Sequence, residues 1–316
     1  MSSLDVAALV VTFRSKPWID RCMQSLFEAK INENWVVDNA SDDGTAAYVR
    51  EHYPEVHLIC GEQNLGFAAG NNLALRQIKA SAVLLLNPDA WLAPQAVGTM
   101  LEVLESDSKI GMVGPSIDRQ GEREPSLLMA PKAFSVWLFL LSGMRAFALG
   151  GFAGKSAKGF PWLTITDGDH IRGSCMLVRQ QAILDAGLLD ESFFLYFEET
   201  EWCLRFRDRG WRVVLEPNAL AYHVGKASVK TQELLPSLEY MRSAVLFWKK
   251  IYIWPVQLLL RGTLFLMANL KWLLLLPISS AGNQRHWLRA VSGLAINPFK
   301  MPMIYDRARR PLSWPE

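Results

Sequence analysis

The stretch Val6–Phe13 (VAALVVTF) decides the fold class of this 316-residue chain. Its apolar, β-branched residues predict a strand that is buried on both faces, as strands of a parallel sheet are. Further short strands are predicted at Asn34–Asp38, Val56–Cys60, Ala82–Leu86 and Ile110–Gly114. Half of the residues are hydrophobic, so the chain has ample material for a core around such a sheet.

Helices are predicted between these strands, at Trp18–Ala29, Thr45–His52, Asn71–Lys79 and Pro94–Ser106. Strand and helix therefore alternate through roughly the first 115 residues, which is typical of an open, doubly wound α/β sheet. Ligands of such sheets bind beyond the carboxyl ends of the strands. Asp38 and Asp89 each follow a strand directly, so both are candidate site residues.

The rest of the chain is less regular. Its predicted elements are a loop and strand at Asp169–Arg179, a short helix at Gln180–Asp185, an acidic cluster leading into a helix at Phe193–Arg209, and a strand at Trp211–Glu216. From Pro236 onward the chain is predicted to be mainly helical, with Pro255 and Pro277 as breakers. The apolar run Ala133–Leu149 contains one arginine and is too short and interrupted for a membrane span.

The net charge of +2 conceals an asymmetry between the two parts of the chain. From Lys226 to the end there are 13 Lys/Arg and four acidic residues, a net charge of +9, whereas the preceding part has 20 basic and 27 acidic residues, a net charge of −7. The tail is also rich in Trp and Leu, which favours an anionic membrane surface over nucleic acid as its partner. A transmembrane helix at Val256–Ser280 would bury Arg261 and Lys271 near the bilayer centre, so an interfacial amphipathic arrangement is favoured.

The cysteines and the N-terminus indicate a reducing compartment. Cys22, Cys60, Cys175 and Cys203 are scattered and form no CxxC pair, so neither a zinc site nor a disulfide framework is predicted. The N-terminal residues lack a basic region followed by an apolar one, so we expect no signal peptide.

Two aspartates and a glycine-containing loop are candidate ligand contacts. Asp38 lies in VVDNASDDGT and Asp89 in LLLNPDAWL, and each has an alternative interpretation as an ordinary turn residue. The loop Gln63–Asn72 (QNLGFAAGNN) offers backbone N–H donors at a helix start, which suit phosphate or sugar groups. Since it is not a GxGxxG motif, a nucleotide-dependent oxidoreductase is disfavoured.

An acidic cluster flanked by aromatic residues is the more unusual feature. Glu198, Glu199 and Glu201 lie within FLYFEETEWCLRF. Carboxylates at a helix N-terminus suit the helix dipole, but aromatic neighbours would also raise the pKa of a carboxylate toward that of a general base. His223 follows the predicted strand Trp211–Glu216, and is either a structural residue or a metal ligand.

In this order, the segments resemble glycosyltransferase family two, which has the GT-A fold, and within it bacterial rhamnosyltransferase-like enzymes. The resemblance covers roughly Val6–Ser228. It rests on the motifs VVTFRS, VVDNASDDGT, NLGFAAGNN, LLLNPDAWL, GSCMLVR, GLLDESFFLYFEETEWCLRFRDRGWRV and AYHVGKAS.

The resemblance implies an α/β fold with a Rossmann-like, mostly parallel sheet and flanking helices. Residues 1–235 would be the GT-A catalytic domain, with a nucleotide-sugar half at about 1–115 and an acceptor half at about 116–235. Residues 236–316 would be a basic, Trp/Leu-rich amphipathic helical region that associates with the membrane.

The resemblance also implies a role for individual residues. Glu199 looks like the catalytic base, with Glu198 as its partner, and Asp38 like the reader of a uracil or thymine base. The donor pocket would be lined by Thr12, Asp38, Asn64, Gly66, Phe67, Gly70, Asn71, Asn87 and Asp89. The acceptor would contact Gly173, Ser174, Glu201 and Trp202, and the metal would be held by Asp89 and His223. Beyond the resemblance, Tyr240 and Arg242 lie at the junction with the basic tail and are candidate contacts for the phosphates of a lipid-linked acceptor.

Two positions depart from the family pattern. The usual Asp-x-Asp reads Asn87-Pro88-Asp89 here, which leaves one carboxylate for a metal. The base is commonly Asp in the family, whereas Glu199 is one methylene longer, which changes its reach toward the acceptor.

The implied function is inverting, metal-dependent glycosyl transfer with Mg²⁺ or Mn²⁺. The donor would be a dTDP- or UDP-linked sugar, with L-rhamnose from dTDP-rhamnose as the first expectation. The acceptor would be a polyprenyl-diphosphate-linked glycan, met by a peripheral protein at the cytoplasmic face of the bacterial inner membrane, in cell-envelope polysaccharide (lipopolysaccharide) synthesis. No nucleic-acid partner is expected.

Two alternative functions are left open by the sequence. A sugar-1-phosphate nucleotidyltransferase also uses an α/β sheet and carboxylates, but it needs a Gly-rich, basic loop after the first strand, where Thr12–Pro17 offers only Arg14 and Lys16. A non-catalytic sugar-binding or scaffold protein would follow if the departures at Asn87 and Glu199 mark a decayed site.

Overall fold

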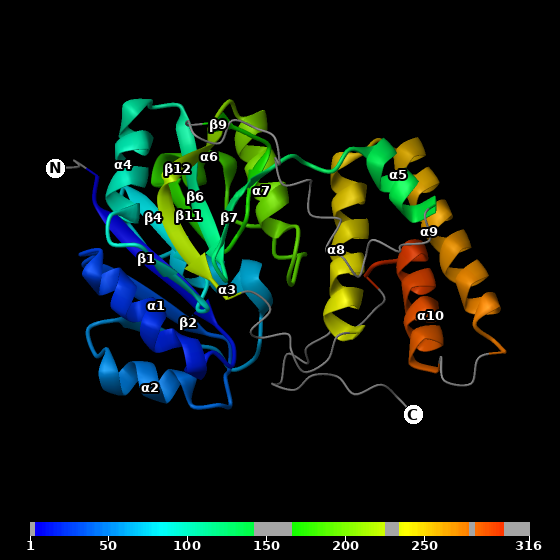
Figure 1. Cartoon of the computed structure of the whole chain (residues 1–316), viewed down its shortest axis with the longest axis horizontal. Coiled ribbons are helices and arrows are strands. Elements are labelled where there is room, and N and C mark those ends of the chain that lie inside the picture. Colours follow the sequence, from blue (N-terminus) through cyan, green and yellow to red (C-terminus); the bar gives the residue numbers. More distant parts are fainter. Residues whose placement is uncertain (1–3, 142–165, 225–233, 278–281, 300–316) are drawn as a thin grey trace.

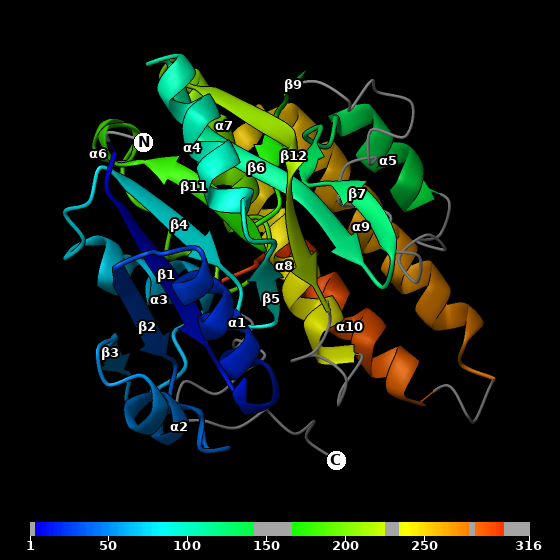
Figure 2. The same cartoon turned by 60° about the vertical axis from the view of Figure 1, so that its left-hand side comes forward.

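The computed structural model describes residues 4–141, 166–224, 234–277 and 282–299. Within them, one large sheet has its strands in the order β3-β2-β1-β4-β11-β6-β12-β5, with β7 paired to β6 and β9 to β12 (Figures 1 and 2). Its strands are β1 Val6–Thr12, β2 Glu33–Asp38, β3 His57–Cys60, β4 Ala82–Leu86, β5 Ala90–Leu92, β6 Ile110–Arg119, β7 Glu122–Pro125, β9 Thr166–Asp167, β11 Cys175–Arg179 and β12 Arg212–His223. A second sheet pairs β8 Leu127–Leu128 with β10 His170–Ile171.

Helices cover both faces of the large sheet. The helices of the α/β body are α1 Lys16–Glu28, α2 Thr45–His52, α3 Gly66–Leu75, α4 Ala96–Ser106, α6 Gln180–Ala186 and α7 Glu198–Asp208. Alternate residues of β1 divide between two cores: Ala8 and Val10 pack with residues of α1 and α4, whereas Ala7 and Leu9 pack with residues of α3, α6 and α7. This is the two-sided burial that the continuous apolar strands require.

The sheet is mixed and mostly parallel, so the expected parallel arrangement holds for the N-terminal strands but not for every strand. The strands β3, β2, β1 and β4 run parallel to one another, but β11 is antiparallel to both β4 and β6, and β5 is antiparallel to β12. The antiparallel pairing of β11 with β4 sets Cys175 opposite Leu86. The residues just before β11 therefore lie beside those just after β4.

Two element boundaries differ from prediction in ways that matter for the site. Helix α3 begins at Gly66, five residues earlier than predicted, so most of the predicted Gly/Asn loop is helical. Strand β12 runs on to His223 instead of ending at Glu216. Its register with β6 shifts between Glu216 and Leu220, and this irregularity accommodates Pro217, which has no N–H for a regular ladder.

The C-terminal region is helical, as predicted. Helices α8 Leu234–Ile251, α9 Trp254–Leu274 and α10 Gly282–Ile296 pack with α5 Ala133–Leu141 beside the α/β body (Figure 1). Pro255 lies in the first turn of α9, where its missing N–H costs nothing, and Pro277 follows the end of that helix. The predicted apolar run continues beyond Leu141 into residues outside the described ranges.

The helical region shares a core with the segment that precedes α7. Phe193 and Phe197 are buried in one cluster with α8 residues such as Phe247 and Trp248. The rings of Phe197 and Phe247 lie 5.2 Å apart. The predicted boundary near residue 235 therefore separates two regions of sequence that pack against one another.

Candidate active site

The first part of the candidate site lies at the ends of β1 and β2. Asp38 is only 2% exposed, and it accepts a hydrogen bond of 2.8 Å from the Thr12 hydroxyl and one of 2.9 Å from the Ser41 backbone N–H. Thr12 and Asp38 are paired in register in the parallel ladder. Thr12 and Asp38, both predicted to line the donor pocket, are therefore in direct contact.

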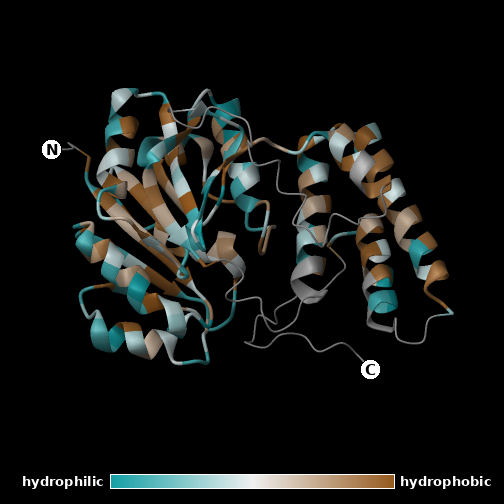
Figure 3. Cartoon of the chain, in the orientation of Figure 1, coloured by the Kyte–Doolittle hydropathy of each residue, from teal (hydrophilic) through white to brown (hydrophobic). Residues whose placement is uncertain are grey.

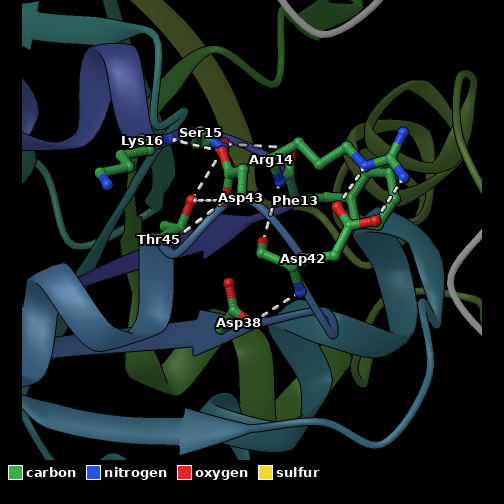
Figure 4. A network of polar contacts seen from close by, with 9 residues as sticks. Phe13, Arg14, Ser15, Lys16, Asp38, Asp42, Asp43 and Thr45 are labelled. Atoms are coloured by element: carbon green, nitrogen blue, oxygen red, sulfur yellow. Dashed lines mark hydrogen bonds and ion pairs between the residues drawn. The ribbon is translucent and has the colours of Figure 1, made fainter.

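The loop after Asp38 is fastened to the loop after β1, as Figure 4 shows. Arg14 forms a two-pronged ion pair with Asp42, with both N···O distances at 2.7 Å. Asp43 accepts hydrogen bonds from the Lys16 and Thr45 backbone N–H groups at 3.1 and 3.0 Å. These contacts hold the turn that contains Asp42 and Asp43 in place next to Asp38.

Helix α3 begins near these loops, and its first turns contain two tightly packed glycines, Gly66 and Gly70. Gly66 has a φ of +80°, and a Cβ built on it would lie 2.2 Å from the Phe194 carbonyl oxygen, so only glycine fits. A Cβ at Gly70 would lie 2.8 Å from a methyl carbon of Val11. The Asn64 side chain accepts a hydrogen bond from the Gly66 N–H at 2.9 Å, and thereby shapes the turn into the helix.

The remaining predicted donor residues of α3 serve the helix itself. The Asn71 side chain donates to the Phe67 carbonyl at 2.8 Å. Phe67 donates its backbone N–H to the Phe194 carbonyl, also at 2.8 Å. The start of α3 is thus tied to the segment that precedes α7.

Asp89 and His223 meet at the ends of β4 and β12, although 134 residues separate them in the chain. The His223 Nε2 lies 3.1 Å from an Asp89 carboxylate oxygen, and both side chains are about nine-tenths buried. The Arg119 guanidinium lies 3.3 Å from the other ring nitrogen, Nδ1. Because arginine only donates hydrogen bonds, Nδ1 acts as the acceptor and Nε2 carries the proton toward Asp89.

Asn87 and Ser174 join this group to the loop before β11. The Asn87 N–H donates to the Ser174 carbonyl at 3.0 Å, a consequence of the β4–β11 pairing. Gly173, next to Ser174, lies close to Glu199 and Phe67. A Cβ built on Gly173 would lie 3.6 Å from both the Glu199 Cγ and the Phe67 ring.

Glu198 and Glu199 open helix α7 as two adjacent carboxyl groups with little access to water. Burial raises the pKa of both above the ordinary value, that of Glu198 further because the neighbouring Glu199 charge adds to the effect. The nearby Arg172 charge and the N–H groups of Thr200 and Gly173 favour the charged form of Glu199. Of the two, Glu199 is therefore the carboxyl group that loses its proton more readily.

Glu199 is also the more accessible of the two. Glu198 is 4% exposed, whereas Glu199 is partly exposed. In the part of the chain that the structure describes, the Oε2 atoms of both carboxyl groups are buried and have no hydrogen-bond partner. A partly exposed carboxyl group with a raised pKa has the properties of a general base.

The backbone before α7 is strained. Tyr196 and Phe197 are consecutive and have φ angles of +70° and +67°, a region that bulky residues rarely adopt. Helix α8 holds this segment: the Ser243 hydroxyl donates to the Leu195 carbonyl at 2.7 Å, and the Tyr240 ring packs 5.1 Å from that of Phe197. The strain positions Glu198 and Glu199 directly after the turn.

The predicted acceptor residues do not all lie in this group. Gly173 and Ser174 do, and the Glu199 charge contributes to the raised pKa of the buried Tyr240 hydroxyl. Trp202 is fully buried in the core and donates its indole N–H to the Gly187 carbonyl, and Glu201 pairs with Arg205 at 2.8 Å. These contacts engage both side chains within the protein, with Trp202 in the core and Glu201 paired along α7.

Arg242 is likewise engaged in a buried contact. It is 6% exposed, pairs with Glu239 at 2.8 Å and donates to the Ser192 carbonyl at 3.3 Å. It therefore contributes to holding the segment before α7.

Two arginines, Arg119 and Arg172, belong to the site but were missed by the sequence interpretation. Arg119 contacts His223, and Arg172 acts electrostatically on Glu199. The position of Arg172 directly before the motif GSCMLVR was the available signal. No periodicity or motif marks Arg119, because it reaches the site through the extension of β6 past Gly114.

The donor atoms at Asp89 and His223 fit a divalent cation that shares its coordination with a substrate. The described residues contain no group of three His, Cys, Asp or Glu side chains that would hold a metal ion by themselves. Mg²⁺ is, however, usually bound by one or two protein carboxylates together with substrate phosphates. Asp89 supplies such a carboxylate oxygen, and the His223 Nε2 beside it would become a nitrogen ligand after losing the proton that it holds toward Asp89.

The chain is similar in sequence to known glycosyltransferases. Residues 7–153 match the glycosyl transferase family 2 domain. The chain is 27% identical over 321 residues to the N-acetylglucosaminyl-diphospho-decaprenol L-rhamnosyltransferase of Mycobacterium tuberculosis, covering 92% of this chain and 99% of that protein. It is 24% identical to the dTDP-rhamnosyl transferase RfbF of Shigella flexneri, covering 67% of this chain and 69% of that protein.

A solved structure shows the same fold. The mannosyltransferase PcManGT from Pyrobaculum calidifontis, in complex with GDP-Man and Mn²⁺, superposes with a TM-score of 0.55 at 16% sequence identity, covering 94% of this chain and 87% of that one. The chain has a GT-A-like α/β fold with a mixed sheet. Residues 7–153 therefore carry a glycosyl transferase family 2 domain, and the chain is a glycosyltransferase.

Proposed function

We propose that the chain is an inverting rhamnosyltransferase-like enzyme, which transfers a sugar from a dTDP- or UDP-linked donor to a hydroxyl of a polyprenyl-diphosphate-linked saccharide. The observation that carries the proposal is the arrangement of Glu199. Its carboxyl group lies across Gly173 and Ser174 from the Asp89–His223 pair. A single displacement needs this separation between the base that activates the acceptor and the groups that bind the donor phosphates.

The residues divide the work of one displacement step. Asp38, held by Thr12 and Ser41, would accept a hydrogen bond from the imide N–H of a uracil or thymine base. Glu199 would remove the proton of the acceptor hydroxyl as its oxygen bonds to the anomeric carbon, while the bond from that carbon to the diphosphate oxygen breaks. Because the oxygen attacks opposite the leaving group, the configuration at the anomeric carbon inverts.

Asp89 and His223 are the residues that would hold Mg²⁺ or Mn²⁺. Bound there, the ion would supply positive charge beside the departing diphosphate. Asn87 stands where a second carboxylate would be expected, and its amide adds no charge to the site. Asp89 therefore carries the whole carboxylate contribution of this motif.

The names of the relatives support the choice of donor and acceptor. The Mycobacterium tuberculosis relative is named as a rhamnosyltransferase acting on N-acetylglucosaminyl-diphospho-decaprenol, and the Shigella flexneri relative as a dTDP-rhamnosyl transferase. dTDP-rhamnose is accordingly the first donor to test. Incorporation of radiolabelled sugar from dTDP-rhamnose, compared with a panel of other nucleotide sugars, into a polyprenyl-diphosphate-linked acceptor is the direct assay. A chain that binds these donors but transfers none of their sugars would favour the scaffold alternative.

We further propose that the helical region binds the cytoplasmic face of a bacterial inner membrane as a peripheral protein. Of 17 exposed large hydrophobic side chains in the described residues, 15 lie in Phe134–Leu141 or Ile251–Phe299. On α9, Leu260, Leu264 and Ala268 face the core, while a second face that includes Leu266 and Leu274 is exposed. Figure 3 colours much of α9 as hydrophobic on the outer side of the helical group.

Charge and helix length support an interfacial arrangement for this region. Anionic lipid would complement the net charge of +9 from Lys226 onward. Arg261 is already engaged, since it donates to the Ala295 carbonyl at 2.7 Å at the end of α10, so other basic residues must meet the lipid phosphates. In the part of the chain that the structure describes, no helix is both long and apolar enough to cross a membrane.

Flotation with vesicles containing phosphatidylglycerol tests the membrane proposal. The double variant Leu266→Gln/Leu274→Gln is expected to lower the vesicle-bound fraction by about tenfold or more, because burial of each leucine contributes about 1.5–3 kcal/mol. Leu184→Gln is the matched control, since Leu184 is 70% exposed on α6, outside this region. Equal flotation of the double variant and the control, or self-association in place of vesicle binding, would contradict the proposal.

A further inference from the structure

Two arginines converge between the Asp89–His223 pair and Glu199. Arg119 ends β6, and Arg172 lies between β10 and β11. The β6–β7 hairpin brings them together: Arg172 pairs with Glu124 of β7 at 3.2 Å, and its backbone N–H donates to the Ser126 carbonyl at 3.0 Å. The ladder sets Glu124 opposite Ile117, two residues before Arg119.

Both guanidinium groups are incompletely satisfied. In the described part of the chain, the Nε atoms of Arg119 and Arg172 are buried and have no hydrogen-bond partner. The Arg172 side chain is 19% exposed, and among the described residues its ion pair is with Glu124, which does not use the Nε donor. A buried donor without a partner costs free energy, so such a pair favours a bound acceptor.

The electrostatic balance also indicates a missing anion. Burial and the nearby Arg119 charge lower the pKa of Arg172, which means that its positive charge is under-compensated, while Glu124 and Glu199 offset part of the effect. Arg123, on the same hairpin, donates to the Pro217 carbonyl and adds positive charge nearby. Two cations held close to one another in a partly buried place are most readily stabilised by an anion between them.

The two side chains bridge the halves of the active site. Arg119 lies 3.3 Å from His223, whose other ring nitrogen faces Asp89. Arg172 precedes Gly173, and a Cβ on Gly173 would lie 3.6 Å from the Glu199 Cγ. An anion held by both arginines would therefore lie beside the reacting groups. The planar donor fork of arginine matches the oxygens of a phosphate group.

We propose that Arg119 and Arg172 form a phosphate-binding site that takes a diphosphate group of a substrate. The proposal deepens the proposed function and rests on it for the identity of that substrate. The diphosphate could come from the nucleotide of the sugar donor or from the link between the acceptor saccharide and its polyprenol. Both sources present the same oxygens to the guanidinium groups.

The test is calorimetric titration of the intact protein with three probes: inorganic pyrophosphate, dTDP, and farnesyl diphosphate in detergent micelles. Arg119→Gln and Arg172→Gln are each expected to raise the Kd for pyrophosphate by about tenfold or more, because each removes charge-assisted hydrogen bonds to the phosphate oxygens. Arg209→Gln is the matched control, since the Arg209 side chain is 57% exposed and lies 3.7 Å from Asp185 on the surface. Its Kd values are expected to equal those of the unaltered protein.

The separate probes distinguish the two sources. Weaker binding of dTDP alone assigns the site to the donor, and weaker binding of farnesyl diphosphate alone assigns it to the acceptor. If the Gln variants match the Arg209→Gln control with all three probes, or if the unaltered protein binds none of them, the pair is only a structural partner of Glu124 and the proposal is overturned. If only the proposed function is wrong, the protein still binds pyrophosphate through the two arginines but transfers no sugar.

A variant that retains the charge distinguishes weaker phosphate binding from a loss of folding. Arg172→Lys keeps the positive charge but removes the planar fork, so it is expected to bind pyrophosphate more weakly than the unaltered protein and more tightly than Arg172→Gln. Circular dichroism melting of all variants shows that they are folded at the titration temperature. If Arg172→Lys binds pyrophosphate as weakly as a folded Arg172→Gln, the positive charge at this position does not contribute to binding, which contradicts the proposed electrostatic role of Arg172.

Discussion

The substitution Glu199→Gln is expected to lower the rate of sugar transfer by about 10²–10⁴-fold, the usual contribution of a general base. The amide keeps the shape of the side chain but cannot take a proton from the acceptor hydroxyl. Donor binding is expected to be retained, because Glu199 lies beside Gly173 rather than beside Asp38 or the Asp42–Arg14 pair. Steady-state kcat with a saturating donor, together with calorimetric titration of dTDP, measures both quantities.

The pH dependence supplies a second readout of the same residue. Burial raises the pKa of Glu199, so its charged form is lost at a higher pH than for an exposed glutamate. The base acts only when it is deprotonated, so kcat/KM is expected to rise with pH through this raised pKa and to fall steeply below it. Glu102→Gln, an exposed change on α4, is the matched control and should keep both rate and profile. Retention of turnover by Glu199→Gln would reject Glu199 as the base.

The substitution Asp89→Ala is the second change with a large expected effect. Asp89 is the only carboxylate of the Asn87-Pro88-Asp89 motif, and its described side-chain contact is with His223. Removing a preorganised group that stabilises leaving-group charge typically costs about 10²–10³-fold in rate. We therefore expect at least this loss in kcat/KM, a weaker affinity for the nucleotide, and the loss of any stimulation by Mn²⁺.

Titration of activity with MnCl₂ and with a chelator measures this effect. Asp208→Ala is the matched control, since Asp208 is exposed at the end of α7, away from β4 and β12. Its metal response is expected to match that of the unaltered protein. Full activity of the unaltered enzyme in excess chelator would contradict a role for Asp89 in holding a metal.

The strands of the N-terminal half were predictable because continuous runs of apolar residues indicate strands that are buried on both faces. The run at Val6–Phe13 and the fully apolar Ala82–Leu86 correspond to β1 and β4, and both lie in the core. The positions of Asp38 and Asp89 after strands followed directly from these runs. Local pattern sufficed here, because continuous apolar segments of this length are stable only between two layers of helices.

The boundaries set by tertiary contacts were not predictable in the same way. Pro217 suggested the end of a strand after Glu216, yet β12 continues past it through an irregularity in its pairing with β6. Helix α3 starts early because the Gly66 conformation and the Phe194 carbonyl fix its first turn, and Phe194 lies far away in sequence. Neither contact leaves a local signal.

The acidic cluster illustrates both the strength and the limit of residue patterns. The aromatic neighbours of Glu198 and Glu199 indicated raised pKa values, in agreement with their burial. The resemblance also implied that Glu201 and Trp202 contact the acceptor, whereas in the structure Glu201 pairs with Arg205 and Trp202 donates to the Gly187 carbonyl. The assignments of the remaining site residues to substrates stay predictions until ligands are bound.

The most direct test of the account is the configuration of the anomeric carbon in the product. The transfer reaction is run with a donor of known anomeric configuration, and the carbon–hydrogen coupling constant at the anomeric centre of the product is measured by nuclear magnetic resonance. A single displacement with Glu199 as the base predicts complete inversion relative to the donor. Retention of the donor configuration would contradict the account, because it requires a step that the proposed role of Glu199 does not provide.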